Sequence, residues 1–187
     1  MSLANKMFGW SGWQNSGSAP HTVASKGTMT SINCGGGNVE SGGYSLGAYR
    51  NVYDIKNNFI YNSGASVGGQ IWATGTSHDR ITVKGGSNGI SFMHHTLVAP
   101  NPTVISNCSF SGLTGRPIRV AETCSAGSTS QPNAWDLINN GLNINDPLSN
   151  FDNFNCIAPG SVVRMQEGNQ ARRITSGGQV TTIAPFA

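Results

Sequence analysis

Charged residues are scarce in this 187-residue chain, and their scarcity limits what the protein can do. Lys, Arg, Asp and Glu make up 10% of the sequence, with 11 basic and 8 acidic residues and a formal net charge of +3. Such a small positive excess, with Arg172-Arg173 as its one pair of adjacent basic residues, does not predict nucleic-acid binding. No cluster of acids typical of a calcium site is present either. We therefore expect no metal and no cofactor.

Long apolar runs and secretion signals are also missing. No apolar run approaches the ~18 residues that a membrane helix requires, and the N-terminus lacks the charged-then-apolar pattern of a signal peptide. Membrane insertion is not predicted. The run Gly35-Gly36-Gly37 lacks the Lys-Ser/Thr of a phosphate loop, so we interpret it as a turn.

The cysteines form no C-x-x-C pair, so a zinc knuckle is not predicted and the spacing leaves disulfides open. They are Cys34, Cys108, Cys124 and Cys156. We interpret Cys108 and Cys156 as small buried hydrophobic residues rather than disulfide partners.

What the sequence does contain is Gly (25 residues) together with 4 Trp, 4 Tyr and 7 Phe. This many aromatic residues at low net charge argues against disorder. The length fits one domain, or a fragment of a larger chain, and is sufficient for a sizeable core. The composition favours a tightly wound extracellular or virion protein over a cytosolic enzyme.

A short pattern recurs between residues 50 and 145: an apolar residue, one free position, Asn, then Asn or Cys, one free position and a second apolar residue. Its copies begin at Ile55, Ile105 and Leu137, and a β-branched run begins at Ile81. Starts at 55, 81, 105 and 137 give gaps of 26, 24 and 32 residues. Units this short cannot bury an apolar face alone and must stack on their neighbours. Their Val, Ile, Thr and Phe content predicts strands.

These Ile-x-Asn-Asn-x-Ile and Ile-x-Asn-Cys-x-Phe rungs resemble those of pectate-lyase-like proteins and phage tailspikes, over roughly residues 45 to 165. The resemblance implies an all-β fold, a right-handed parallel β-helix (a solenoid) of about five or six coils. An Asn at a tight bend of such a coil points inward and bonds the next rung. We predict this position for Asn57, Asn107 and Asn139.

We divide the chain into three parts. Residues 1–48 are predicted to be an irregular N-terminal segment or a first coil, and residues 49–168 the parallel β-helix. Residues 169–187 are predicted to form a C-terminal cap or a tail exchanged with a neighbouring subunit, because an uncovered coil end invites pairing with other chains. Residues 74–80 are predicted to be a polar loop.

Asp79 and Glu122 are the predicted catalytic residues, because hydrolysis of a glycosidic bond needs two carboxyls ~5 to 9.5 Å apart. We expect Asp79, beside Arg80, to stay ionised and Glu122 to be desolvated enough to hold a proton. Asp54 and Asp136 share a register but are expected ~14 Å apart, which is too far. The alternative is that Asp79 caps a turn and Glu122 is a solvated strand end.

Trp72, His78, Arg80 and Trp135 are the predicted substrate-binding residues, because flat aromatic faces beside polar groups suit sugar rings. Packing aromatics are the alternative for both Trp residues. A lyase would instead need a base and a cation near a uronate carboxylate.

The resemblance implies a tailspike-like protein of the virion, outside the cell, that binds a bacterial surface polysaccharide and, if catalytic, depolymerises it as a glycoside hydrolase or lyase. A homotrimer is expected. The alternative function is a non-catalytic structural or assembly segment of a phage tail fibre or spike.

Overall fold

The chain is all-β in the parts that the structure describes. This computed structural model describes backbone and side chains at residues 75, 77–83, 87–93, 101–124 and 130–187. At Lys84 and in the strands before residue 72 it describes the backbone alone. None of the described residues form a helix long and apolar enough to cross a membrane.

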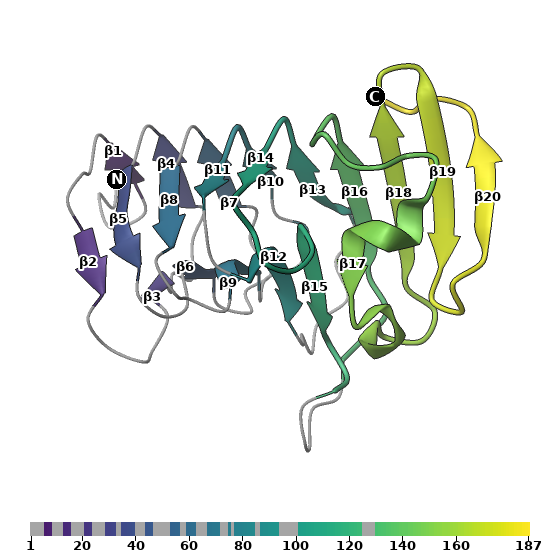
Figure 1. Cartoon of the computed structure of the whole chain (residues 1–187), viewed down its shortest axis with the longest axis horizontal. Coiled ribbons are helices and arrows are strands. Elements are labelled where there is room, and N and C mark those ends of the chain that lie inside the picture. Colours follow the sequence, from purple (N-terminus) through teal and green to yellow (C-terminus); the bar gives the residue numbers. More distant parts are fainter. Residues whose placement is uncertain are drawn as a thin grey trace.

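The strands build three sheets (Figure 1), which we name A, B and C. In spatial order, nine-stranded sheet A contains β1 (Lys6–Phe8), β4 (Met29–Ile32), β7 (Tyr53–Lys56), β10 (Ser77–Asp79), β13 (Thr103–Ser106), β16 (Ala134–Ile138), β18 (Val162–Glu167), β19 (Gln170–Thr175) and β20 (Val180–Ile183). Five-stranded sheet B contains β14 (Ser109–Ser111), β11 (Thr82–Lys84), β8 (Phe59–Asn62), β5 (Gly35–Val39) and β2 (Trp13–Asn15). Six-stranded sheet C contains β17 (Phe151–Asp152), β15 (Ile118–Ala121), β12 (Asn88–Met93), β9 (Val67–Ile71), β6 (Tyr44–Leu46) and β3 (His21–Val23).

From β1 to β16, consecutive strands go to sheets A, B and C in turn, and the strands of each round pair in parallel with their counterparts in the next. We call each round a triplet. Successive triplets follow one another along the long axis of the molecule (Figure 1). The strands within residues 1–48, β1 to β6, obey the same order. Residues 1–48 thus contain two triplets of strands.

The register of sheet A corrects the predicted repeat at one place. Ile55 aligns with His78, His78 with Ile105, Ile105 with Leu137, and Leu137 with Met165. Ile81 is therefore not the counterpart of Ile55, because the equivalent position holds a histidine. Ser77–Asp79 is strand β10, so the prediction of a polar loop over residues 74–80 was wrong there.

The core is one continuous apolar cluster between the sheets. The rings of Phe92 and Trp135 stack with centroids 3.7 Å apart at 3°, and Phe151 meets Phe92 edge-on at 6.4 Å. Gly89 is needed beside this cluster, since a Cβ there would lie 2.3 Å from Phe110 Cδ1 and 2.6 Å from the Pro117 carbonyl. Aromatic stacking and close backbone approach thus fix how β12 packs.

The bend that follows strands β10, β13 and β16 of sheet A repeats with the same backbone geometry. Arg80, Asn107 and Asn139 have φ of 52°, 53° and 52°, the left-handed region that asparagine tolerates better than most residues. The N–H of each donates to a carbonyl of the next triplet, that of Ser106, Ile138 and Gln166 respectively, at 2.8–3.0 Å. The bend thus satisfies its own backbone by bonding along the stack.

The prediction that Asn107 and Asn139 point inward was wrong by one residue. Both are exposed, whereas the residues after them, Cys108 and Asn140, are buried. Asn140 Nδ2 donates to the Ile105 carbonyl at 2.8 Å, and Cys108 N donates to Asn140 Oδ1 at 2.9 Å. In both described pairs, Asn107-Cys108 and Asn139-Asn140, the second position therefore supplies the buried group. Asn57 lies outside the described residues.

The C-terminal end departs from the triplet pattern. Sheet B ends at β14, while two short 3-10 turns, η2 (Pro147–Asn150) and η3 (Phe154–Cys156), flank β17. Strands β19 and β20 run antiparallel and extend sheet A as a hairpin of the same chain. Gln166 Oε1 accepts from the N–H groups of Phe186 and Ala187 at 2.7 and 2.9 Å, which fixes the last residues against β18.

Candidate functional site

Four of the predicted site residues fall into two separate polar clusters, Asp79 and Arg80 in one and Glu122 and Trp135 in the other. The bend cluster consists of Asp79, Arg80, Ser106 and Asn107. The Glu122 cluster consists of Glu122, Thr123, Trp135, Ala158 and the half-cystines Cys124 and Cys156.

In the bend cluster, Asp79 joins two triplets. Its Oδ1 accepts from Ser106 Oγ and from Asn107 Nδ2, both at 2.9 Å, and its Oδ2 lies 2.8 Å from Arg80 Nη1. The Asp79 side chain is 13% exposed and that of Arg80 54%. These bonds match the alternative in which Asp79 caps a turn. Of the ion pair, Arg80 is the residue that is accessible to solvent.

His78 lies one residue earlier and points into the core. It has no exposed surface and sits in register between Ile55 and Ile105. Burial lowers the pKa of His78 from 6.5 to about 3, because the charged imidazolium loses its hydration. A neutral, fully buried ring offers no surface to a polysaccharide, so we withdraw His78 as a substrate-binding residue.

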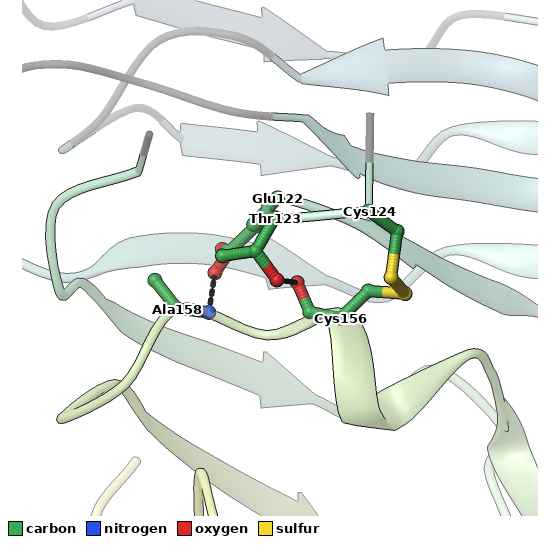
Figure 2. The surroundings of a disulfide bond; sticks show 5 residues. All are labelled: Glu122, Thr123, Cys124, Cys156 and Ala158. Carbon is green, nitrogen blue, oxygen red and sulfur yellow. Dashed lines mark hydrogen bonds between the residues drawn. A yellow bond between two sulfur atoms is a disulfide. The ribbon is translucent and has the colours of Figure 1, made fainter. Parts of the chain in front are cut away.

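Glu122 follows β15 and is completely buried. Its Oε1 accepts from Trp135 Nε1 at 3.0 Å and its Oε2 from the Ala158 N–H at 2.5 Å; Figure 2 shows the bond to Ala158. Burial raises the pKa of Glu122 from 4.5 to about 7, against the smaller lowering effects of those two bonds. The predicted desolvation of Glu122 is thus confirmed. Because Glu122 has no exposed surface, its carboxyl does not line a groove. For the same reason it is not the solvated strand end of the alternative interpretation.

A disulfide closes the same cluster (Figure 2). Cys124 and Cys156 are bonded, with Cα atoms 5.2 Å apart. The interpretation of Cys156 as an unpaired buried hydrophobe was therefore wrong. Thr123 donates to the Cys156 carbonyl through both its N–H, at 2.9 Å, and its Oγ1, at 3.0 Å. Cys108 is free and buried, as predicted, and burial raises the pKa of its thiol to about 12.

Trp135 is a packing aromatic, the alternative to sugar binding. It has no exposed surface, stacks on Phe92 and donates to Glu122. Its burial removes it from the substrate-binding set. Trp72 lies outside the described residues.

The structure does not bring Asp79 and Glu122 together. Asp79 lies at the bend from sheet A to sheet B, whereas Glu122 lies beyond the sheet C strand of the next triplet. The expected register of Asp54 and Asp136 is correct, since Asp54 aligns with Ser77, Ser77 with Val104, and Val104 with Asp136. Three strand spacings separate them by ~14 Å. Neither pair is arranged for glycoside hydrolysis.

Other carboxyls are engaged by partners that sequence reasoning missed. Asp136, with its side chain 7% exposed, accepts from Arg164 Nε at 2.7 Å and Nη2 at 2.5 Å. Glu167 accepts from three successive backbone N–H groups, residues 140 to 142, at 2.9–3.1 Å. Asp152 accepts from Asn88 Nδ2 at 2.5 Å and from the Arg116 N–H at 3.3 Å. These partners lie 25 to 64 residues away along the chain, so no local motif marks them.

Among the described residues, no group of three or more His, Cys, Asp or Glu side chains is placed to hold a metal ion. No protein-family model, no curated protein and no solved structure gives a significant match to this chain.

Proposed function

We propose that this chain forms a right-handed parallel β-helix and belongs to a tailspike-like virion protein that binds a bacterial surface polysaccharide. The observation that carries the proposal is the repeated A-B-C strand order with parallel pairing from triplet to triplet. Crossovers between parallel strands of one sheet are right-handed in nearly all proteins, which supports the handedness. Stacked triplets make a long, rigid surface on which a polymer can lie.

The outer face of sheet B supports polysaccharide binding. Thr82 and Ser109 are in register there, with Ser109 Oγ donating to Thr82 Oγ1 at 3.3 Å, and Ser111 follows on the same face. Both serines are exposed. Short hydroxyl side chains on the face of a sheet offer donors and acceptors to sugar hydroxyls.

A second candidate function is the non-catalytic structural or assembly segment of a tail fibre or spike. It is favoured by the carboxyls, because every described carboxyl except that of Asp146 has a bonded or ion-paired partner within the fold. Depolymerisation by Asp79 and Glu122 has no geometric support. A disulfide such as Cys124–Cys156 persists in oxidising surroundings, which fits a virion or extracellular location.

The proposal includes a homotrimer of side-by-side β-helices, because few charges are available to keep the flanks solvated. Light scattering at micromolar concentration checks it. A single mass near the 19.6 kDa of one chain would contradict the trimer but not the proposal that the protein binds a polysaccharide.

The experiment that separates the functions uses purified protein with a panel of bacterial capsular and O-antigen polysaccharides. The expected result is saturable binding to one polymer, measured by titration calorimetry. A simultaneous assay for new reducing ends or unsaturated uronates reports hydrolysis or elimination. Absence of binding to every polymer would replace the primary proposal with the structural segment.

A further inference from the structure

The segment of residues 153–158 follows β17 of sheet C, precedes β18 of sheet A and packs against the aromatic part of the core. Phe154 packs against the core edge-on to Phe151, with ring centroids 5.1 Å apart, and Ile157 and Ala158 are 3% and 0% exposed. The segment holds only one short 3-10 turn, η3. Its order therefore depends on bonds to other elements.

The three consecutive residues that follow β15, Glu122, Thr123 and Cys124, each bond to this segment (Figure 2). Glu122 accepts the Ala158 N–H, Thr123 donates twice to the Cys156 carbonyl, and Cys124 forms the disulfide to Cys156. Glu122 also holds Trp135 Nε1. One carboxyl thus connects this segment to Trp135, whose ring stacks on Phe92 in the aromatic core.

Among the residues that the structure describes, no cation is bonded to Glu122 to compensate its charge when it ionises. On β15, Arg119 alternates with the buried Ile118 and Val120, so it faces outward. On β16, Asp136 is bonded to Arg164, and on β17, Asp152 is bonded to Asn88. The disulfide does not titrate. Ionisation therefore leaves a buried negative charge supported by two N–H donors only, and such a charge strongly favours opening to water.

We propose that the Cys124–Cys156 disulfide and the Glu122 carboxyl act together as a latch that holds residues 153–158 over the aromatic core. The latch opens when the disulfide is reduced and the carboxyl is ionised, and either condition alone leaves it closed. Cys124 is exposed while Cys156 is 3% exposed, so a thiolate attacks Sγ of Cys124. A dithiol reductant completes the step: its two sulfurs form a disulfide, and two electrons and two protons convert Cys124 and Cys156 to thiols.

The direction with pH follows from burial. The pKa of Glu122 is raised to about 7 in the folded protein, so the closed segment binds the proton more tightly than the open segment. Closure is strongest below the ordinary carboxyl pKa and weakens as pH rises towards 7. The latch is therefore firm in acidic or oxidising surroundings and open in neutral to alkaline, reducing surroundings.

Hydrogen exchange tests the latch in the folded protein. The protection factors of the Ala158 amide and the Trp135 indole N–H are measured at pH 5 and pH 8, with and without a dithiol. In the reduced protein we expect protection at both positions to fall at least about tenfold from pH 5 to pH 8. In the oxidised protein both stay protected at both pH values.

Two variants and one internal control complete the test. Reduced E122Q cannot ionise, so its protection should not change between pH 5 and pH 8. The Asn107 amide, bonded to the Ile138 carbonyl at 2.9 Å, should keep its protection throughout. The double variant Cys124→Ser, Cys156→Ser should behave as the reduced protein, and if it does not fold, dithiol treatment of the folded protein gives the same test. Equal protection at both pH values in the reduced protein, or parallel loss at Asn107, overturns the latch.

Discussion

Asn107 and Asn139 occupy the same bend in successive triplets, with φ of 53° and 52°, and each donates its N–H to the next strand of sheet A. At Asn107, the side chain also donates to Asp79. This relationship separates two contributions to stability: tolerance of a left-handed backbone and a side-chain bond to the preceding triplet.

Substitution of Asn107 separates these contributions. Asn107→Ala should lower the free energy of unfolding by about 1 to 2 kcal/mol, because alanine is strained at positive φ and the bond to Asp79 is lost. Asn107→Gly loses the same bond without the strain and should be about 1 kcal/mol more stable than Asn107→Ala. Urea denaturation measures both. If the two variants are equally stable, the left-handed bend is wrong.

Much of the fold was accessible from the sequence because strand rungs repeat their apolar residues. Ile55, Ile105 and Leu137 are indeed aligned in sheet A. His78 broke the pattern, since a histidine in a core position carries no apolar signal, and the prediction moved to Ile81 instead. The inward position was misassigned by one residue because both members of an Asn-Asn pair suit a bend, and only the backbone geometry distinguishes them.

The candidate site was harder to predict from the sequence than the fold. The arrangement of the site depends on hydrogen bonds between residues that are distant in the chain. One example is the bond from the Ala158 N–H to Glu122, which lie 36 positions apart. Local context indicated the desolvation of Glu122, flanked by Ala121 and Thr123, but neither its complete burial nor its bond to Ala158. The same limit applies to the disulfide, since four cysteines allow several pairings.

Gly89→Ala tests the close packing between β12 and the sheet B side of the core. A Cβ at residue 89 would lie 2.3–2.6 Å from two Phe110 ring atoms and the Pro117 carbonyl. We expect a loss of about 1 to 3 kcal/mol in the free energy of unfolding. Gly177→Ala is the matched control, because its Cβ would meet nothing nearer than Thr175 Oγ1 at 3.9 Å. Equal thermal stability of the two variants would contradict this packing.

Glu122 should make stability depend on pH in the weakly acidic range. Its pKa is raised from 4.5 to about 7 in the folded state, so its contribution is complete below pH 4.5 and is lost as pH rises to 7. The loss amounts to about 3 kcal/mol. The difference in unfolding free energy between the parent and Glu122→Gln, measured at pH 4.5 and pH 7.5, isolates this contribution. A difference that does not change with pH would mean that Glu122 is solvated.

His78 should act in the opposite direction. Its pKa is lowered from 6.5 to about 3, so the folded protein favours the neutral ring and stability falls as pH drops below 6.5. For a fully buried ring the loss approaches about 5 kcal/mol near pH 3. His78→Ile, which matches its register neighbours Ile55 and Ile105, should remove this acid sensitivity. Acid denaturation followed by circular dichroism provides the measurement, and an unchanged midpoint for the variant would argue against burial of His78.

The last prediction concerns Asp79, whose bonds to Ser106, Asn107 and Arg80 indicate a structural role. Asp79→Asn keeps an oxygen acceptor but loses the ion pair with the half-exposed Arg80, so stability should fall by no more than about 1 kcal/mol. If the protein cleaves a polysaccharide, the release of reducing ends by Asp79→Asn should stay within about twofold of the parent, because a carboxylate occupied by three partners is not free to act as a base or nucleophile. Arg80→Gln is the control, since it breaks the same ion pair and leaves the carboxylate in place. Loss of cleavage in Asp79→Asn alone, with binding and stability retained, would return Asp79 to the catalytic role that the sequence first indicated.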